Sequence, residues 1–269
     1  MSDDPVRIRE VGPRDGFQNE PETIPTDDKV RLVEMLARTG LRRLEVTSFV
    51  RADVIPQLAD GPEVLTRADI PDDVAVTVLI PNERGLDNAL ELRDRFQEVN
   101  LFLSASESHN QANVNRSIEE SLSGLENVVA RALAEGLRCE AVISVVFGCP
   151  YEGDVPPERV FAIAERLRAA GCAELGFADT TGMANPAQVR EFFAAAFERL
   201  PGAEGGDRQH RQRGPRLDAA RDGPSDRHRP RQAARLRARG PADPRPSARQ
   251  PPVDGGTRGL AAQLMVTSN

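Results

Sequence analysis

The sequence has few aromatic residues, few cysteines and no long apolar run. Its 269 residues include no Trp, one Tyr and three Cys. Cys139, Cys149 and Cys172 are far apart and form no C-x-x-C pair, which excludes a disulfide scaffold and a paired-cysteine zinc or redox motif. No apolar run reaches the roughly 18 residues of a membrane span, and the N-terminus lacks the apolar core of a secretory signal. We therefore expect a cytoplasmic protein with free thiols and no membrane partner.

Charge divides the chain into two unlike parts. Residues 1–204 carry a net charge of −15, whereas residues 205–269 carry +8, with 14 Arg and no Lys. Gly, Ala, Pro and Arg make up 39 of the last 65 residues, and none of the 65 is aromatic. Such a segment cannot bury enough apolar surface to offset its chain entropy. We predict one domain over residues 1–204 and a disordered tail over residues 205–269.

The composition of the tail suggests two origins. Codons built only from G and C encode Gly, Ala, Pro and Arg, so a shifted reading frame near residue 204 of a G+C-rich gene would produce this composition. The alternative is a genuine basic tail on a non-catalytic chain that binds an acidic partner. Arginine runs bind phosphates non-specifically, but the tail lacks the aromatic residues on which nucleic-acid bases stack. We therefore rank nucleic acid low among its partners.

Strand and helix signals alternate through residues 1–204. This alternation indicates parallel strands joined by right-handed crossovers. Six such units are fewer than a (β/α)8 TIM barrel of about 250 residues needs. The pattern predicts an α/β fold, either a TIM barrel with about six of its units or a six-stranded open sheet. The predicted strands are residues 6–11, 43–47, 74–79, 99–104, 140–147 and 174–178, and the predicted helices are residues 26–39, 117–135, 157–170 and 186–199.

Two of these helices begin with recognisable signals. Thr26 precedes two acids and is a candidate N-cap. Ser117 is followed three residues later by Glu120, which is the spacing of a capping box.

Charged side chains follow the strands, where a parallel barrel places its active site. Arg14 and Asp15 follow the first strand; the carboxylate could hold a hard cation and the guanidinium could stabilise an oxyanion. Glu45 lies inside an apolar strand, where its charge needs a partner, and we predict a pair with Arg14. Asp179 follows the sixth strand and could transfer a proton or cap the next helix. Purely structural ion pairs and caps remain alternatives for all four residues.

Two further residues have reactive side chains but weak signals. Cys149 lies in a Gly/Pro-rich turn, and a lone cysteine of this kind is more often inert than nucleophilic. His109 lies in the polar segment of residues 104–121, where we expect a solvated loop.

Several segments together resemble the 3-hydroxy-3-methylglutaryl-CoA lyase family. In chain order they are VGPRDGFQNEP, LEVTSFV, PQLADGPEVL, ASESHNQANVNRSIEES, GCPYEG and DTTGMANP, within residues 6–200. The R-D-G-x-Q element alone is shared by a broader superfamily of metal-dependent lyases and Claisen-type synthases. A related aldolase or synthase is therefore the alternative function.

The resemblance implies a TIM barrel that binds acyl-CoA and a divalent cation, Mg²⁺ or Mn²⁺. The implied reaction cleaves 3-hydroxy-3-methylglutaryl-CoA to acetyl-CoA and acetoacetate, a step of leucine degradation and ketone-body metabolism. The intact family is expected to form homo-oligomers. By resemblance, the catalytic residues are Arg14, Glu45 and Asp179, the substrate-binding residues are Gln18, Ser48 and Asn113, and the metal ligand is Asp15.

The family completes its site with an H-x-H pair after strand seven, an asparagine after strand eight and a glycine-rich loop with a cysteine. Residues 205–269 contain none of these motifs. An incomplete barrel leaves open strand edges on its first and sixth strands. We therefore expect the purified chain to be aggregation-prone and inactive.

The shifted-frame hypothesis can be tested on the gene alone. Translation beyond codon 204 in the other two frames should yield an H-x-H segment and a glycine-rich loop with a cysteine, because both belong to the family pattern. The hypothesis is wrong if neither frame contains them.

Overall fold

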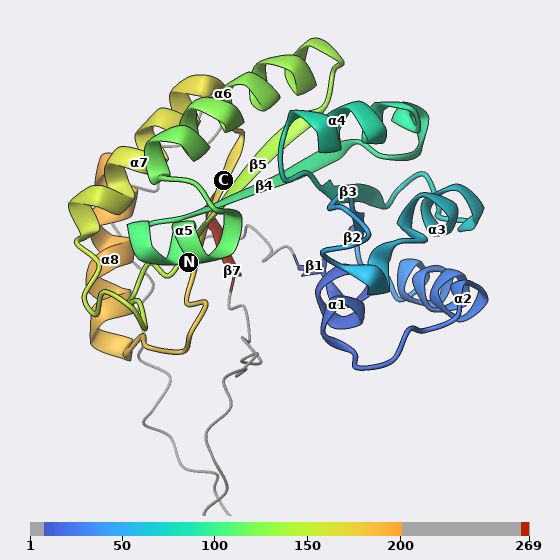
Figure 1. The fold of residues 1–269 in the computed structure, drawn as a ribbon, viewed down its shortest axis with the longest axis horizontal. Helices are drawn as coiled ribbons and strands as arrows, with labels where there is room; N and C mark the ends of the chain where they lie inside the picture. Colours follow the sequence, from blue (N-terminus) through green and yellow to red (C-terminus); the bar gives the residue numbers. More distant parts are fainter. Residues whose placement is uncertain (1–7, 201–264, 269) are drawn as a thin grey trace, which may run out of the picture. The chain divides into compact units, whose positions relative to one another are not determined.

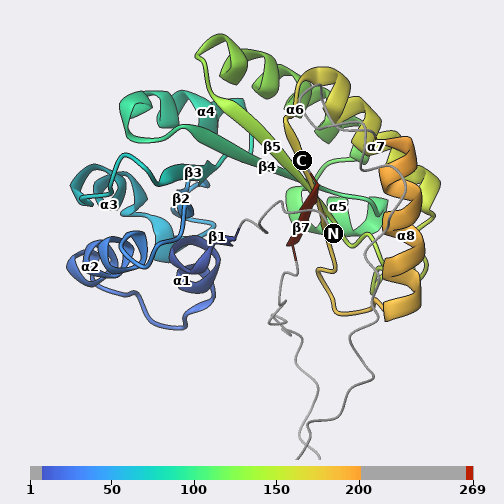
Figure 2. The same cartoon turned by 180° about the vertical axis from the view of Figure 1, so that it is seen from behind.

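Six parallel strands lie side by side in chain order and curl into a half-barrel with the helices on its outer face (Figures 1 and 2). The computed structural model describes residues 8–200 and 265–268. The prediction of an incomplete TIM barrel is confirmed, because consecutive strand order is that of a barrel and not of a doubly wound sheet. The strands are β1 (Arg9–Glu10), β2 (Arg43–Ser48), β3 (Ala75–Leu79), β4 (Glu98–Ser104), β5 (Arg138–Ser144) and β6 (Glu174–Ala178).

The helices connect these strands. The long ones are α2 (Thr26–Ala37), α6 (Ile118–Ala134), α7 (Pro157–Ala170) and α8 (Pro186–Arg199). The predicted bounds of α7 and α8 are confirmed, and α6 begins with the predicted capping box. Shorter elements are η1 (Gly12–Gly16), α1 (Phe17–Asn19), η2 (Pro56–Leu58), α3 (Gly61–Arg67), α4 (Glu83–Leu90), η3 (Arg93–Arg95) and α5 (Glu107–Val114).

Three predictions about local structure are wrong. Thr26 is inside α2 and not its N-cap: Pro25 is the N-cap, and the Thr26 hydroxyl donates to Asp60 Oδ2 at 2.8 Å and accepts from no N–H group of the helix. The fifth strand ends at Ser144, because Val145 has a φ of 53°, which an extended strand does not permit. The polar segment around His109 is not a loop but contains α5, whose N-terminus is capped by the Ser106 hydroxyl.

A seventh strand, β7 (Met265–Ser268), pairs antiparallel with β6. It lies in the segment expected to be disordered, so that expectation does not hold for these four residues. It also covers the β6 edge that was predicted to be open. The rest of the predicted tail lies outside the described residues.

The side chains of each strand alternate between the helices and the barrel interior. On β4, Val99, Leu101 and Leu103 are fully buried or nearly so in the core shared with the helices. Glu98 and Asn100, which alternate with them, instead contact side chains of β3 and β2, namely Thr77 and Glu45. The half-barrel therefore has an apolar outer layer and a polar interior, and the interior contains the candidate site. In the described part of the chain no helix is long and apolar enough to cross a membrane.

Lys29, the lysine of α2, is 1% exposed. Its Nζ donates to Asp60 Oδ1 at 2.6 Å and to the Gln57 carbonyl at 2.5 Å, which ties α2 to the start of α3. Lys29→Met should lower the free energy of unfolding by about 3 kcal/mol, because it leaves Asp60 without its cation in a partly buried position. Urea denaturation measures the change.

Arg31→Met is the matched control on the same helix. Arg31 is 75% exposed and 3.4 Å from Asp28, so its loss should change the free energy of unfolding by less than about 0.5 kcal/mol. Equal effects of the two substitutions would contradict a stabilising role of the Lys29 pair.

Candidate active site

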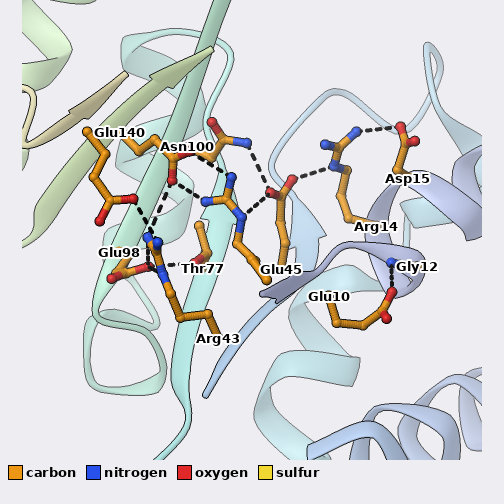
Figure 3. A network of polar contacts seen from close by, with 12 residues as sticks. Glu10, Gly12, Arg14, Asp15, Arg43, Glu45, Thr77, Glu98, Asn100 and Glu140 are labelled. Atoms are coloured by element: carbon orange, nitrogen blue, oxygen red, sulfur yellow. Dashed lines mark hydrogen bonds and ion pairs between the residues drawn. The ribbon is translucent and has the colours of Figure 1, made fainter. Parts of the chain in front are cut away.

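Arg14 lies at the carboxyl end of β1 between two carboxylates (Figure 3). One turn of π-helix, η1, follows β1, and within it the N–H groups of Arg14 and Asp15 both donate to the Val11 carbonyl, at 3.0 and 2.7 Å. Arg14 is 5% exposed. Its Nε donates to Glu45 Oε1 at 2.5 Å and its Nη1 to Asp15 Oδ1 at 2.8 Å. The predicted Arg14–Glu45 pair is confirmed.

Gly12, at the start of this turn, lies close to the side chain of Glu10. Its N–H donates to Glu10 Oε1 at 2.6 Å. A Cβ at this position would lie 2.8 Å from that oxygen, so any larger residue would displace the Glu10 carboxylate. Only the end of the flexible Glu10 side chain would have to move, so a larger residue here would break this hydrogen bond more than it would strain the backbone.

Glu45 is fully buried on β2, and nitrogen atoms lie against both of its carboxylate oxygens. Oε1 accepts from Arg14, Oε2 accepts from Asn100 Nδ2 at 3.0 Å, and Arg9 Nε lies 3.8 Å from Oε2. A buried carboxylate is tolerated only when cations and donors replace the lost water. These contacts meet that requirement and fix the side chain.

Below Glu45, a network of arginines and glutamates fills the barrel interior (Figure 3). Arg43 donates to Glu98 at 2.8 Å and to Glu174 at 2.7 Å, and Arg9 pairs with Glu140. Burial disfavours the charge of Arg43, but the hydrogen bonds from Arg43 to the two glutamates outweigh it and raise its pKa. Burial raises the pKa of Glu140, against the opposing effect of Arg9.

Asp179 lies at the end of β6, where the sequence predicts it. Its two carboxylate oxygens accept from the backbone N–H groups of Met183 at 2.9 Å and Ala184 at 3.2 Å. The structure therefore shows Asp179 holding its own loop. The alternative that it caps the next helix is wrong, because Asn185 is the N-cap of α8 and accepts from the N–H groups of Ala187 and Gln188. The catalytic role of Asp179 stays a prediction.

Ser48 and Asn113, two of the three predicted substrate-binding residues, line the same open pocket of about 1510 Å³, which also involves α3, α4 and α6; Arg14, Asp15, Glu45 and Asp179 are not among its lining residues. Ser48 is buried, and its hydroxyl has no hydrogen-bond partner in the part of the chain that the structure describes. Asn113 is exposed on α5. Gln18, the third, is half-buried on α1 and is not among the residues that line this pocket.

The loop after β5 contains Cys149 and Glu152. Cys149 is buried, and its Sγ lies 3.0 Å from the Ser106 hydroxyl. Cys139 and Cys172 lie in the apolar core, where burial raises their pKa values to about 11 and about 12, as expected of inert thiols. His109 on α5 is half-buried and not solvated as expected, and burial lowers its pKa.

The described residues do not complete a cation site. Asp15 offers a carboxylate with a side chain that is 26% exposed, and one of its oxygens already accepts from Arg14. Nowhere in residues 8–200 are three or more His, Cys, Asp or Glu side chains grouped so that they could hold a metal. Hard cations need several oxygen ligands, so Asp15 is at most one of a larger set.

Three interior residues of this site were not predicted from the sequence. Arg9, Arg43 and Asn100 lie in predicted strands, and their contacts reach across to other strands. The available signal was a polar residue at alternate positions of β4, Glu98 and Asn100, inside an otherwise apolar run. Such a pattern predicts a polar interior but does not tell which partner each side chain meets.

The chain is similar to known proteins over most of its described part. Residues 5–211 match the family model described as HMGL-like. The hydroxymethylglutaryl-CoA lyase of Bacillus subtilis is 47% identical over 196 residues, which are 73% of this chain and 65% of that protein. A cytoplasmic 3-hydroxy-3-methylglutaryl-CoA lyase of Danio rerio is 41% identical, with 73% of this chain and 58% of that protein covered. The chain therefore spans less than two thirds of the length of these relatives.

Solved structures match over the same part. The HMG-CoA lyase structure from Bacillus subtilis has a TM-score of 0.71 at 47% identity and covers 73% of this chain and 65% of that one. An HMG-CoA lyase from Acinetobacter baumannii was solved in complex with coenzyme A and 3-methylmalate. It has a TM-score of 0.67 at 37% identity, and the match covers 72% of this chain and 62% of that one.

Glu152 connects the loop after β5 to two helices. Its carboxylate accepts from the Ser108 N–H at 2.7 Å and from Arg159 Nη1 at 3.1 Å. Burial raises the pKa of Glu152, but the hydrogen bonds from Ser108, Ser106 and Arg159 outweigh it and lower the pKa to about 2.

A carboxyl group whose pKa is lower in the folded than in the unfolded state stabilises the fold at pH values above its unfolded-state pKa. It loses that contribution as the pH falls towards its folded-state pKa. Glu152→Gln should therefore lower the melting temperature at pH 7, and the difference from wild type should shrink below about pH 4.5. Thermal unfolding by circular dichroism across this pH range measures it. Glu158→Gln, at an exposed position on α7, is the control and should show no such pH dependence. A Glu152→Gln effect that stays constant with pH would rule out the ionised carboxylate as the cause.

Proposed function

The chain belongs to the HMGL-like family, and on this premise we propose that the described residues form part of the active site of a metal-dependent carbon–carbon lyase. The proposed reaction cleaves 3-hydroxy-3-methylglutaryl-CoA to acetyl-CoA and acetoacetate. The observation that carries the proposal is the buried guanidinium of Arg14, held by Glu45 and Asp15 at the end of β1.

Arg14 would stabilise the charge that forms in this reaction. Breaking the carbon–carbon bond leaves its electron pair on the acetyl-CoA side as an enolate, with negative charge on the thioester oxygen. A guanidinium has five N–H groups. Glu45 accepts a hydrogen bond from Nε–H and Asp15 accepts one from Nη1–H, so three N–H groups remain to donate to that oxygen. The guanidinium keeps its charge throughout because it does not deprotonate, and a donor fixed in advance acts without reorganisation.

The carboxylates around Arg14 have different parts in the proposal. Glu45 is fully buried and orients Arg14 without reaching solvent. The tertiary hydroxyl must lose a proton as the bond breaks, and Asp179 is our candidate acceptor. Two backbone N–H groups already bind its carboxylate, so proton transfer to Asp179 would compete with these bonds.

The proposal includes a divalent cation, Mg²⁺ or Mn²⁺, with Asp15 as one ligand. A bound cation of this kind makes a hydroxyl easier to deprotonate. Because the described residues offer no ligand cluster, a complete site needs further ligands.

We also propose an acyl-CoA as the substrate class. The relative from Acinetobacter baumannii was solved with coenzyme A, and the pocket lined by Ser48 and Asn113 is large enough for an extended ligand. A cytoplasmic location and a homo-oligomeric state are proposed on the family resemblance; names of relatives include both cytoplasmic and mitochondrial forms.

The experiment measures acetoacetate release from 3-hydroxy-3-methylglutaryl-CoA with Mg²⁺ or Mn²⁺. It uses this chain and a chimera in which the part after residue 200 is replaced by the corresponding part of the Bacillus subtilis relative. The chimera should cleave the substrate, whereas this chain should not. Arg14→Gln in the chimera should lower kcat/KM by about 10²- to 10³-fold, as expected for the loss of one oxyanion donor.

Arg190→Gln, at an exposed position on α8, is the matched control and should leave the rate unchanged. A folded chimera that cleaves nothing would refute the lyase proposal, and condensation without cleavage would favour the synthase alternative. Turnover by this chain at the rate of the chimera would contradict the expected inactivity.

A further inference from the structure

Asn100 is a buried polar residue in the middle of β4, and its side chain reaches the candidate site through Glu45. It is 1% exposed. Its Nδ2 donates to Glu45 Oε2 at 3.0 Å, and the other oxygen of the same carboxylate accepts from Arg14 Nε at 2.5 Å. Asn100, Glu45 and Arg14 thus form one continuous chain of hydrogen bonds across three elements (Figure 3).

The contact with Asn100 fixes the orientation of the Glu45 carboxylate. A carboxylate at the end of a glutamate rotates over a broad range because its last torsion has shallow minima. With a donor on Oε2 and another on Oε1, rotation breaks two hydrogen bonds at once. Arg9 also lies near Oε2, but at 3.8 Å it attracts the charge without defining its plane.

The orientation of the Asn100 amide follows from the same contact. A flipped amide would place its oxygen against the carboxylate, which is repulsive, so Nδ2 must face Glu45. This leaves Asn100 Oδ1 buried without a hydrogen-bond partner in residues 8–200. Buried polar atoms without partners are rare, and each requires an explanation.

A second such atom lies at the same level of the sheet. Ser48 on β2 pairs with Leu79 on β3, and Leu79 pairs with Asn100 on β4. The Ser48 hydroxyl is also buried without a partner among the described residues. Asn100 therefore lies level with Ser48, a predicted substrate-binding residue, whereas Glu45 lies lower in the sheet, level with Thr77 and Glu98.

We infer that Asn100 is a positioning residue that acts through Glu45 to hold the Arg14 guanidinium in place. The inference rests on the proposed function in one respect, namely that Arg14 faces the enolate oxygen. The placement of Arg14 by Asn100 does not require turnover. It can therefore be measured in the ligand-free chain.

The test observes the Arg14 Nε–H group by NMR in the full chain labelled with ¹⁵N-arginine. The signal is assigned by its absence in Arg14→Gln. In wild type, an Nε–H bonded to a buried carboxylate should exchange slowly with solvent. Asn100→Ala should accelerate this exchange by about 10-fold or more, because Glu45 is then free to rotate. Asn100→Asp, which keeps the shape but places a like charge against Glu45, should accelerate it further.

Thr77→Val is the matched control. Thr77 is a fully buried neighbour on β3 whose hydroxyl donates to Glu98 at 2.9 Å, so its loss removes one neutral donor from a buried glutamate without touching Glu45. The Arg14 exchange rate should stay within about 2-fold of wild type. Asn100→Ser, which retains a hydrogen-bond donor, should give an Arg14 Nε–H exchange rate between those of wild type and Asn100→Ala.

Unchanged exchange in folded Asn100→Ala and Asn100→Asp would overturn the inference. Equal acceleration by Thr77→Val would also overturn it, because it would indicate general loosening of the interior. In the chimera, Asn100→Asp should lower kcat by about 10- to 100-fold with little change in KM, the pattern of a lost transition-state interaction. If the chimera cleaves nothing while the NMR result holds, the proposed function fails and the positioning role stands.

Discussion

The pairing of the buried Glu45 carboxylate with Arg14 is the interaction on which the rest of the site depends. Neither charge would be stable alone in the barrel interior, because both are almost completely removed from water. Together they place a guanidinium at the end of β1 with part of its donors unused. Asp15 and Asn100 then limit the motion of this pair from either side.

The charged interior extends this constraint down the barrel. Arg43 joins Glu98 on β4 and Glu174 on β6, and Arg9 on β1 joins Glu140 on β5. Each pair links strands that are not neighbours in the sheet, so the network resists flattening of the curled strands. In other proteins, replacement of such buried ion pairs by well-packed apolar residues is often neutral or stabilising. We interpret the network as a means of fixing the curvature and of supplying a polar floor beneath the site.

The half-barrel holds one side of the proposed active site. The ends of β1 and β2 provide Arg14, Asp15, Glu45 and Ser48, and the loops after β5 and β6 provide Cys149 and Asp179. The loop residues are held in place by hydrogen bonds within their own loops and to adjacent helices. Arg14, which we propose to stabilise the oxyanion, lies among the described residues, whereas a complete cation site does not.

The sequence by itself determined the order and type of the long elements, because strand and helix periods, a capping box and helix-starting prolines are local signals. It also determined the Arg14–Glu45 pair, since a charge inside an apolar strand demands a partner and few candidates were near. Only the tertiary structure decided that Thr26 bonds to Asp60 in place of capping its own helix. It likewise decided that Val145 ends β5, that β7 covers β6 and that Asn100 reaches Glu45. Each of these depends on atoms distant in the chain, and local propensity carries no information about which distant group arrives.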